Sequence, residues 1–598
     1  MMSSTFIFRT GNRFRKLESP SFVKVSKKVY DHNYSGTPII NLQILLRNIY
    51  NGDTLKAFGR SKVAVASILM RALSVKSVIN ASSVILYHVA LLFVFTTFSA
   101  VSAHPISSAT QEVAGSEPPL TILISYDGFH PSYVNSKSTP FMHSLLVGYH
   151  NESGVMTAPY MRPSFPSETF PQHWTLVTGR RPGSHGLVAN RFYDVDLKKT
   201  FTYTKSPQDP RFWMGADPIW YVAQKDLRKS NYKVGVHFWP GSEAVYDEPY
   251  QEKEFRVPYI FDKFDQFESM EQKLGRLFEL VDMPPQEKPN MILTYAPEVD
   301  SVAHDYGNSW DLPLLHDALT KVDDFLKNVM QGLHDRGIAG NTNVIVVSDH
   351  GMARLSKEKN IYYLKDYLSE EEYNRISHIS GAVNTAIHIK NEDHDVRNLI
   401  DFYFLLKEKF ADLPFDVYLR EEIPLRYEYQ GKHNSRIAPL WIMARPNNYL
   451  DVSNKKPATP EKGEMGSHGY DNRHVDMRAH FIGIGPYFGT DNKTRYLAPF
   501  DNIEVFQLLC DMIRIPERRP SDATWSWPFS GMSEAEWDSI SLPSGWCEYN
   551  PYLEKRYNGS TFNLLWNCAK PNDDAFNVIS APDSNIPRRE GVLSALNM

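Results

Sequence analysis

Cysteine is scarce in this chain. Its 598 residues include three cysteines, Cys510, Cys547 and Cys568. Three thiols exclude a disulfide-rich scaffold, and their spacing excludes a zinc site built from Cys-x-x-Cys pairs. Cys510 lies in the apolar run 505–513 (VFQLLCDMI), which predicts a buried core position. For Cys547 and Cys568 two interpretations stay open: a disulfide formed in an oxidising compartment, or two free buried thiols.

Positive charge is not in excess either. The formal net charge is −5 at pH 7, so no general basic field attracts nucleic acid, and no nucleic acid polymer is expected as a stable partner. A small nucleotide remains compatible with this charge, because a bound metal ion can supply positive charge locally. No internal repeat is visible, and no feature of the sequence predicts a protein partner.

Charged residues are missing from one long stretch. Residues 77–103 contain no Asp, Glu, Lys or Arg, and a membrane span needs about 20 apolar residues. Residues 1–76 hold 13 Lys and Arg against three Asp and Glu. That excess of basic residues keeps the N-terminus in the cytosol and sends the chain from residue 104 onward across the membrane. The sequence therefore predicts a single-pass type II membrane protein with an extracellular or lumenal catalytic domain.

A cleaved signal peptide is the competing interpretation. Residues 101–103 (VSA) have the small-x-small pattern of a cleavage site, and cleavage after Ala103 would secrete the protein. Met70 begins a segment that resembles a signal-peptide start, which gives the hypothesis that residues 1–69 extend the true reading frame. The long basic segment and long apolar run favour the anchor. Both interpretations export the remaining chain, in agreement with three N-x-S/T sequons, at Asn151, Asn492 and Asn558.

Composition divides the chain into five parts. The basic segment 1–76 and the membrane segment 77–103 precede residues 104–118, which are rich in Ser, Pro and Gly and are typical of a stalk. Residues 119–515 form the expected catalytic domain. Residues 516–598, rich in Pro, Trp, Asn and Ser, are expected to form a C-terminal extension packed on it.

Buried strands alternate with helices in residues 119–515. Three short apolar runs are typical of parallel strands covered on both faces: 121–127 (TILISYD), 291–296 (MILTYA) and 343–349 (NVIVVSD). Residues 268–281 and 311–337 have helical patterns. This alternation predicts an α/β sandwich.

Acidic and imidazole groups follow each of these runs. In chain order they are Asp127, then Asp300 and His304, then Asp349 and His350. Catalytic groups of open α/β sheets gather at the carboxyl ends of strands, so we expect these side chains to converge. His468 lies in the loop 466–472 (GSHGYDN), where the flanking glycines allow close approach of the backbone.

Three aspartates and three histidines are a suitable ligand set for zinc or a similar divalent ion. Six ligands are too many for one tetrahedral ion and are enough for two. Two metal ions about 4 Å apart hold the attacking and leaving oxygens of a displacement at phosphorus. A single aspartate after a strand is more often a helix cap or turn residue, so the prediction depends on the joint occurrence of these groups.

Thr169 is the candidate nucleophile. It precedes Phe170 and Pro171 at the expected entrance of a short helix in HWTLVTG (173–179). A hydroxyl bound to a dication at such a position can attack as an alkoxide at neutral pH. The alternative is that Thr169 merely caps the helix, and spacing alone does not separate these two roles.

Six segments resemble, in this order, motifs of the ectonucleotide pyrophosphatase/phosphodiesterase family of the alkaline phosphatase superfamily. They are YDGF (126–129), PSETFPQHWTLVTGRRPGSHGLVANRFYD (166–194), WPGSE (239–243), PEVDSVAHDYG (297–307), VVSDHGM (346–352) and GSHGYDN (466–472). The resemblance covers roughly residues 119–515. It implies an alkaline-phosphatase-like α/β/α sandwich with a mixed, mostly parallel sheet and two Zn²⁺ ions.

The resemblance also implies roles for individual residues. One zinc would be held by Asp300, His304 and His468, and the other by Asp127, Asp349, His350 and the Thr169 oxygen. Asn190 matches an asparagine that contacts a non-bridging phosphate oxygen. Phe170 and Tyr295 match aromatic residues that pack on the nucleoside base.

The implied activity is hydrolysis of nucleoside triphosphates, dinucleotides and nucleotide sugars to nucleoside 5′-monophosphates through a nucleotidyl-threonine. A phosphomonoesterase, or a phosphodiesterase for phospholipid or choline-type diesters, would share the metal ligands, because a choline group also packs on aromatic rings. A catalytically inactive ectodomain is the alternative from another class. It would be expected to lose a ligand or the nucleophile, and all seven positions are kept.

Overall fold

The fold is described from a computed structural model of the chain. It describes residues 118–246, 253–390, 396–453, 457, 461–497, 499–515 and 521–523. The chain divides into two compact units, Met1–Ser108 and Ala109–Met598, and every described residue belongs to the second. The predicted membrane segment 77–103 lies outside the described residues, as do Cys547, Cys568 and Asn558. Within the described ranges, no helix is both long and apolar enough to cross a bilayer.

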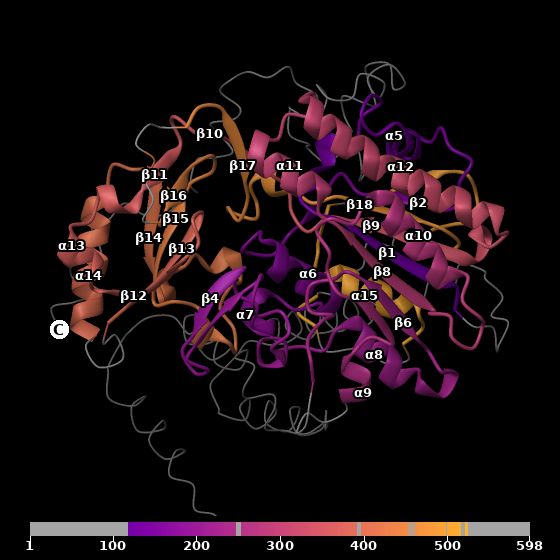
Figure 1. The fold of residues 1–598 in the computed structure, drawn as a ribbon, viewed down its shortest axis with the longest axis horizontal. Helices are drawn as coiled ribbons and strands as arrows, with labels where there is room; N and C mark the ends of the chain where they lie inside the picture. Colours follow the sequence, from indigo (N-terminus) through magenta and orange to yellow (C-terminus); the bar gives the residue numbers. More distant parts are fainter. Residues whose placement is uncertain are drawn as a thin grey trace, which may run out of the picture. The chain divides into compact units, whose positions relative to one another are not determined.

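An eight-stranded mixed sheet forms the centre of the fold (Figure 1), in the order β19-β2-β18-β9-β1-β8-β6-β7. The five strands from β9 to β7 are parallel, whereas β18 runs antiparallel to both β9 and β2. The bounds are β1 (Leu120–Tyr126), β2 (Val155–Thr157), β6 (Val234–His237), β7 (Ile260–Asp262), β8 (Met291–Ala296), β9 (Thr342–Val347), β18 (Phe481–Ile484) and β19 (Thr494–Tyr496). The three predicted strands are β1, β8 and β9, which confirms the mixed, mostly parallel α/β sheet.

Helices cover both faces of this sheet (Figure 1). Successive side chains of a strand point to opposite faces, so Ile122 and Ile124 of β1 join one apolar cluster and Leu123 joins the other. The first cluster packs against α5 (Pro140–Val147), α10 (Met270–Val281), α11 (Glu298–Tyr306) and α12 (Pro313–Asp335). The second packs against α6 (Thr169–Thr178), α8 (Ile219–Asp226) and α15 (Glu504–Met512). The predicted helices 268–281 and 311–337 are α10 and α12, and Cys510 is buried in α15 as predicted.

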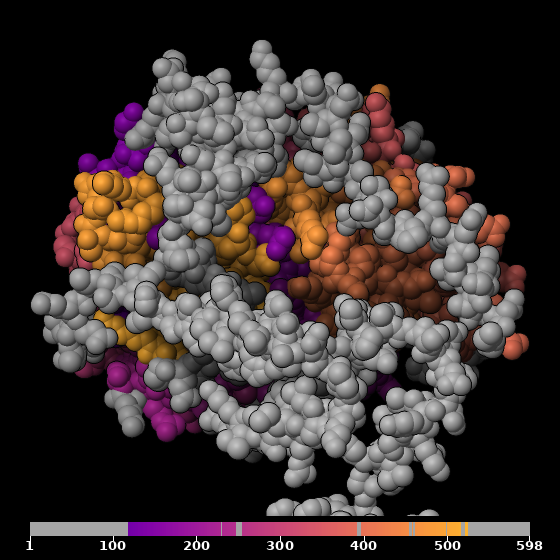
Figure 2. Space-filling model, turned by 180° about the vertical axis from the view of Figure 1, so that it is seen from behind, coloured from indigo at the N-terminus to yellow at the C-terminus, as the bar shows by residue number. Residues whose placement is uncertain are grey.

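A second, antiparallel sheet was not predicted from the sequence. Its strand order is β12-β13-β15-β14, and α14 (Val396–Lys409) packs on it over a separate apolar core. The strands are β12 (Ile376–Ser380), β13 (Asn384–Ile389), β14 (Phe415–Leu419) and β15 (Leu440–Ala444). Figure 2 shows its orange atoms on one side of the visible face, the amber atoms of the last described segments on the other, and indigo atoms between them.

Three smaller strand pairs complete the surroundings of the site. The hairpin β4 (Arg191–Asp194) and β5 (Lys199–Thr202) lies beside β12. The strand β10 (Ala353–Ser356), which begins soon after β9 ends, pairs antiparallel with β17 (Glu464–Ser467). The pairing of β10 with β17 joins segments more than one hundred residues apart. It places the loop that follows β17 near the end of β9. The strands β3 (Met161–Arg162) and β20 (Phe500–Asp501) also pair, and they join an early and a late segment of the described chain.

Acid should destabilise the fold through its buried neutral histidines, and His185 is the clearest case. His185, the last residue of α7 (Pro182–His185), is fully buried, and burial lowers its pKa to about 3. Its Nδ1 accepts a hydrogen bond from Leu187 N (3.1 Å), so protonation there would break that bond. The folded state keeps His185 neutral, so its contribution to stability is present above the usual histidine pKa of about 6.5 and is lost as pH falls toward 3.

We therefore expect the His185→Gln variant to be less stable than the parent at pH 7. The gap between their free energies of unfolding should narrow by about 1.4 kcal/mol for each pH unit below 6.5. Denaturant titrations between pH 7 and 4 measure this gap, with His316→Gln on the surface of α12 as the control. A gap that stays constant across this range would contradict the assignment.

Candidate metal centre and active site

Six side chains converge at the carboxyl ends of the central strands. Asp127 follows β1, Asp349 and His350 follow β9, and α11, which begins two residues after β8, supplies Asp300 and His304. The strands β8, β1 and β9 are neighbours and parallel, so their ends meet at one edge of the sheet. The pairing of β10 with β17 brings His468 to the same place. All six predicted ligands are thus brought together.

Two glycines permit this close packing. Gly128 has a φ of +65°, and a Cβ there would stand 3.0 Å from the Cβ of Asp300. A Cβ on Gly466 would stand 2.5 Å from the carbonyl oxygen of Ala303 in α11. The glycine after Asp127 and the glycine two residues before His468 therefore let three segments approach closely, as expected for residues that lack a side chain.

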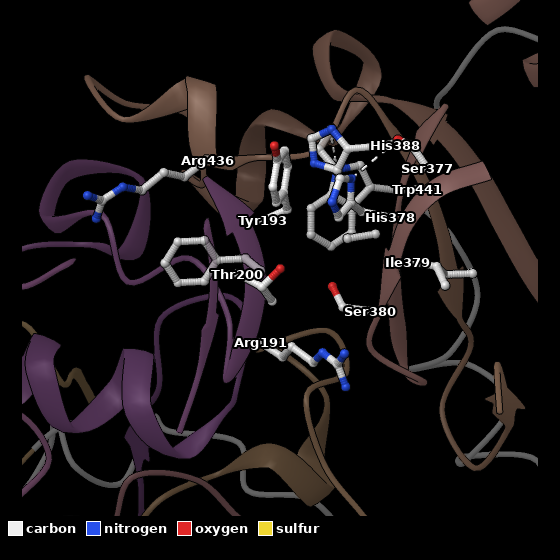
Figure 3. A pocket seen from close by; sticks show the side chains of 13 residues that line it. Arg191, Tyr193, Thr200, Ser377, His378, Ile379, Ser380, His388, Arg436 and Trp441 are labelled. Carbon is white, nitrogen blue, oxygen red and sulfur yellow. Dashed lines mark hydrogen bonds between the residues drawn. The ribbon is translucent and has the colours of Figure 1, made fainter. Parts of the chain in front are cut away.

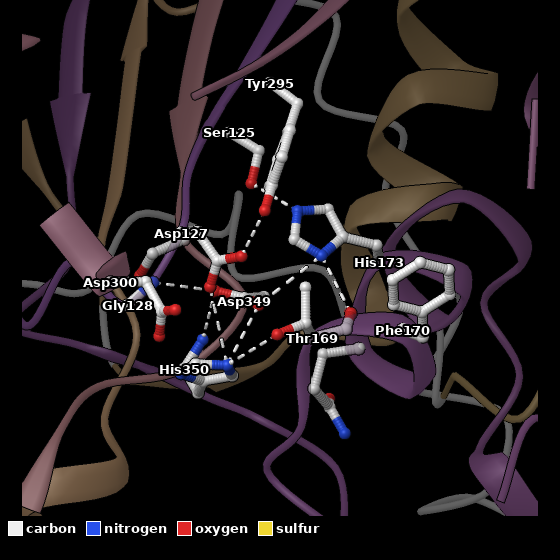
Figure 4. A network of polar contacts seen from close by, with 12 residues as sticks. Ser125, Asp127, Gly128, Thr169, Phe170, His173, Tyr295, Asp300, Asp349 and His350 are labelled. Atoms are coloured by element: carbon white, nitrogen blue, oxygen red, sulfur yellow. Dashed lines mark hydrogen bonds and ion pairs between the residues drawn. The ribbon is translucent and has the colours of Figure 1, made fainter. Parts of the chain in front are cut away.

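The ligand atoms form two clusters. In the first, His350 Nε2 lies 3.1 Å from Asp349 Oδ2, 3.5 Å from Asp127 Oδ1 and 3.4 Å from Thr169 Oγ1 (Figure 4). In the second, His304 Nε2 lies 3.0 Å from His468 Nε2, and these atoms are 3.5 and 3.6 Å from Asp300 Oδ1. Tetrahedral donors at zinc bond lengths of about 2.0–2.1 Å stand about 3.3 Å apart. The separations therefore fit one small dication per cluster.

The hydrogen bonds of the histidines leave their Nε2 atoms free for a metal. The Nδ1 atoms of His304, His350 and His468 lie 2.9 to 3.0 Å from the backbone carbonyls of Gly466, Gly351 and Ser167. Each Nδ1 therefore carries the proton, and each Nε2 presents a lone pair, as in metal-ligating histidines. Two such lone pairs, on His304 and His468, face each other at 3.0 Å. A cation between them would turn this repulsion into attraction.

The carboxylates also require a cation. Asp127 Oδ1, Asp300 Oδ1 and Asp349 Oδ2 are buried and accept no hydrogen bond from any described residue. Burial, and then repulsion from a neighbouring aspartate, raise the pKa of all three carboxyls well above their usual range. Burial also lowers the pKa of His350 well below its usual value and that of His468 to about 3. The site thus gathers anionic and neutral donors that only a bound cation can satisfy.

Thr169 stands at the edge of the first cluster, as the first residue of α6. The N-cap position belongs to Glu168, and no side chain makes a capping hydrogen bond there. The capping role considered for Thr169 is therefore not observed. Its hydroxyl points instead toward His350 (Figure 4), at the N-terminal end of a ten-residue helix whose dipole favours negative charge.

Asn190, just before the hairpin, contacts the residue that follows Thr169. Its Oδ1 accepts a hydrogen bond from Phe170 N (2.8 Å), which leaves the amide NH₂ as the group that can donate to a ligand. The Phe170 ring packs near Tyr203 and Trp213, with centroids 5.8 and 6.2 Å away. The Tyr295 ring lies 5.9 Å from Phe264, whose side chain is half exposed. Both residues that are predicted to pack on a base thus belong to groups of aromatic rings.

The family description "Type I phosphodiesterase / nucleotide pyrophosphatase" matches residues 121–471, more than half of the chain and all seven candidate positions from Asp127 to His468. The chain belongs to this family.

Curated relatives agree with this assignment. Ectonucleotide pyrophosphatase/phosphodiesterase 1 of Saccharomyces cerevisiae is 34% identical over 483 residues, which are 75% of this chain and 63% of the relative. The chain thus spans less than two thirds of that relative's length. A second S. cerevisiae protein, ectonucleotide pyrophosphatase/phosphodiesterase 2, is 34% identical over 65% of this chain and 80% of the relative.

A solved structure also resembles this chain. Murine ectonucleotide pyrophosphatase/phosphodiesterase 5, an inactive threonine-to-alanine variant in complex with AMP, superposes with a TM-score of 0.58 at 27% identity. The match covers 69% of this chain and 99% of the murine chain. It extends the agreement from sequence motifs to the arrangement of the strands and helices.

In this phosphodiesterase family member, sequence reasoning missed several supporting residues. Tyr295 donates from its hydroxyl to Asp127 Oδ2 (2.5 Å), so it also holds a candidate ligand. His173 contacts Thr169 O and Ser125 Oγ, each at 2.8 Å. Position 173 is four residues after Thr169, and this helical spacing is a signal that could have pointed to it.

Glu168 is the other missed residue. It is half-buried next to Thr169, and its Oε2 accepts a hydrogen bond from Asn190 N (2.6 Å). Desolvation raises its pKa to about 7, while hydrogen bonds from Asn190 and Asn384 oppose that rise. The Asn384 amide also donates to Gly469 O, beside His468. Glu168 and Asn384 therefore connect the candidate nucleophile, the hairpin and the His468 loop, three segments whose proximity exists only in the folded chain.

Proposed function

We propose that this chain is a two-zinc hydrolase that cleaves phosphodiester and pyrophosphate bonds of nucleotides. Its substrates would be nucleoside triphosphates, dinucleotides and nucleotide sugars, with release of nucleoside 5′-monophosphates through a nucleotidyl-threonine. The observation that carries the proposal is the position of the Thr169 hydroxyl, 3.4 Å from His350 Nε2 at the edge of two adjoining clusters of Asp and His side chains that could hold metal ions.

The donor set supports zinc. Asp127, Asp349, His350 and the Thr169 oxygen would hold one ion, and a second set, Asp300, His304 and His468, the other. Imidazole nitrogen combined with carboxylate oxygen suits zinc better than magnesium or calcium, which prefer oxygen alone. When bound, two such ions would favour the alkoxide form of the hydroxyl and oppose the charge that develops on the phosphoryl oxygens.

The reaction would proceed in two displacements at phosphorus. The Thr169 oxygen attacks in line, its bond to phosphorus forms, and the bond from phosphorus to the leaving oxygen breaks. Water then attacks the nucleotidyl-threonine, and the bond to the Thr169 oxygen breaks to release the monophosphate. The free amide NH₂ of Asn190 would donate to a non-bridging oxygen in both steps, where charge accumulates.

The surroundings of Thr169 support a nucleotide as substrate. The Phe170 ring lies near Tyr203 and the Tyr295 ring near His173, and aromatic rings of this kind can stack on a base. The AMP complex of the murine relative shows that this fold accommodates a nucleoside monophosphate in that protein. His304 is the most exposed of the three ligands of the second cluster, with 37% of its side chain exposed. The leaving group would therefore depart on the solvent side.

We also propose that the catalytic domain is extracellular or lumenal. Of the three sequons after residue 103, two lie on exposed residues, Asn151 and Asn492, as glycan attachment requires. Whether residues 77–103 anchor the chain or are cleaved would be decided by the N-terminus of the mature protein and by its retention in membranes after an alkaline wash.

A substrate panel tests the proposed activity. The purified chain should hydrolyse a nucleotide 5′-p-nitrophenyl ester and should convert ATP to AMP and pyrophosphate. Hydrolysis of p-nitrophenyl phosphate should be at least a hundredfold slower, because that monoester lacks a nucleoside. Release of ADP and phosphate from ATP would contradict a nucleotidyl-threonine. Faster cleavage of p-nitrophenylphosphorylcholine than of the nucleotide ester would favour the choline-type alternative.

A further inference from the structure

A second pocket lies between the β4–β5 hairpin and the antiparallel β12–β13 pair (Figure 3). Its volume is about 220 Å³, below the roughly 300–1,000 Å³ of pockets for drug-sized ligands. The pocket therefore suits a compact group. None of the six predicted metal ligands lines it, and neither does Thr169.

Three polar groups without partners face this space. Figure 3 shows the hydroxyls of Thr200 and Ser380 directed toward each other across it, with the Arg191 guanidinium at one end. Ser380 is buried and Thr200 is half-buried, whereas Arg191 is exposed. Within the described part of the chain, none of the three side chains has an ion pair or a hydrogen-bond partner. The three groups are therefore available to a ligand that enters the pocket.

The charge of the lining selects an anion. None of the described residues that line the pocket carries a carboxyl group, and two histidines, His378 and His388, lie in its wall. Arg436 also lines it, but its guanidinium donates to Asp194 and to backbone carbonyls, which leaves it no role toward a ligand. Arg191 thus provides the uncommitted positive charge. Its planar fork of donors matches the oxygens of a phosphoryl group.

The pocket adjoins the segment of the chain that reaches Thr169. Arg191 lines the pocket, and the residue before it, Asn190, accepts a hydrogen bond from Phe170 N, next to Thr169. Further along β4, the Tyr193 ring stacks on His378 in the pocket wall, with centroids 3.6 Å apart. The two sites are distinct, because no candidate metal ligand lines the pocket, but adjacent residues of the chain reach each of them.

We propose that this pocket is a second anion site, which binds a phosphate-class oxyanion through the Arg191 guanidinium and the Thr200 and Ser380 hydroxyls. Two sources supply that chemistry: a free inorganic anion, or a phosphoryl group on the part of a substrate beyond the scissile bond. Binding of a free anion is independent of the proposed function, whereas the second source rests on it.

Calorimetric titration of inorganic phosphate into the metal-loaded full chain tests the site. The parent chain should bind one more phosphate than the Arg191→Gln variant, or bind it at least tenfold more tightly. Ser380→Ala should weaken the same binding. Lys199→Gln, which removes a charge from β5 outside the pocket, should leave it unchanged. Equal stoichiometry and affinity in the parent and Arg191→Gln would overturn the proposal. Arg191 is exposed, so the variant should fold, and binding does not require turnover.

Kinetics then identify the source of the anion. If the pocket binds a substrate phosphoryl group, Arg191→Gln should raise the ratio of KM for ATP to KM for the p-nitrophenyl ester at least fivefold. If it binds a free anion, that ratio should be unchanged while phosphate binding is still lost. If the parent chain hydrolysed none of these substrates, the proposed function would be refuted, whereas the calorimetric result on phosphate binding would still stand.

Discussion

Thr169→Ala is expected to lower the turnover of the metal-loaded chain by several orders of magnitude, since deletions of a nucleophile cost up to about 10⁶. The variant removes the oxygen that would form the covalent bond to phosphorus. It leaves Asp127, Asp349 and His350 of the adjoining cluster in place. Initial rates with a nucleotide p-nitrophenyl ester, together with metal content and a melting curve, measure the effect.

Two further variants make this test specific. Thr169→Ser keeps a hydroxyl and should retain measurable turnover, and Thr204→Ala, in the exposed turn after β5, should behave like the parent. Since Thr169 makes no capping hydrogen bond, its loss should not bring even the cost of about 1 kcal/mol that removal of an N-cap usually has. A well-folded, metal-loaded Thr169→Ala protein that hydrolyses the nucleotide ester near the parent rate would contradict the covalent mechanism.

Removal of the metal ions is expected to abolish activity, and re-addition of zinc to restore it. Without cations, three buried aspartates face one another with orphaned oxygens, and their repulsion should also lower the melting temperature. The purified chain should contain about two zinc ions, as in a two-metal phosphoryl-transfer site. Elemental analysis, activity in chelator and melting curves measure these effects.

A matched pair of aspartates on α11 sharpens the metal prediction. Asp300→Asn replaces a half-buried carboxylate of the second cluster. Loss of a residue that only supports a metal ligand already costs about 10- to 100-fold in metal affinity or activity, so loss of this candidate ligand should lower metal affinity and turnover by at least about a hundredfold. Asp305→Asn alters an exposed residue of the same helix and should change neither. A single metal ion per parent chain, or full activity in strong chelator, would contradict the two-metal interpretation.

Local sequence was sufficient where burial alone selects the structure. The apolar runs at β1, β8 and β9 are short and β-branched, so these three central strands and their parallel arrangement followed from the sequence. The helices α10 and α12 were predicted from the helical spacing of their apolar residues. The antiparallel sheet β12-β13-β15-β14 did not follow, because β13 and β15 are buried on both faces and lack the alternation typical of antiparallel strands with one solvated face.

The sequence by itself determined the chemical character of the site: Asp127, Asp349 and their partners each follow a strand or sit in a glycine-flanked loop, and the chemistry of each side chain is local. Only the tertiary structure decided how these groups meet. The pairing of β10 with β17 places His468 beside His304, and the fold brings Glu168 within hydrogen-bond distance of Asn190 and Asn384. It also creates the pocket between Arg191 and Ser380, which lie 189 positions apart. Such contacts join segments that are far apart in the chain. The residues of one segment carry no local signal of which distant segment will pack against them.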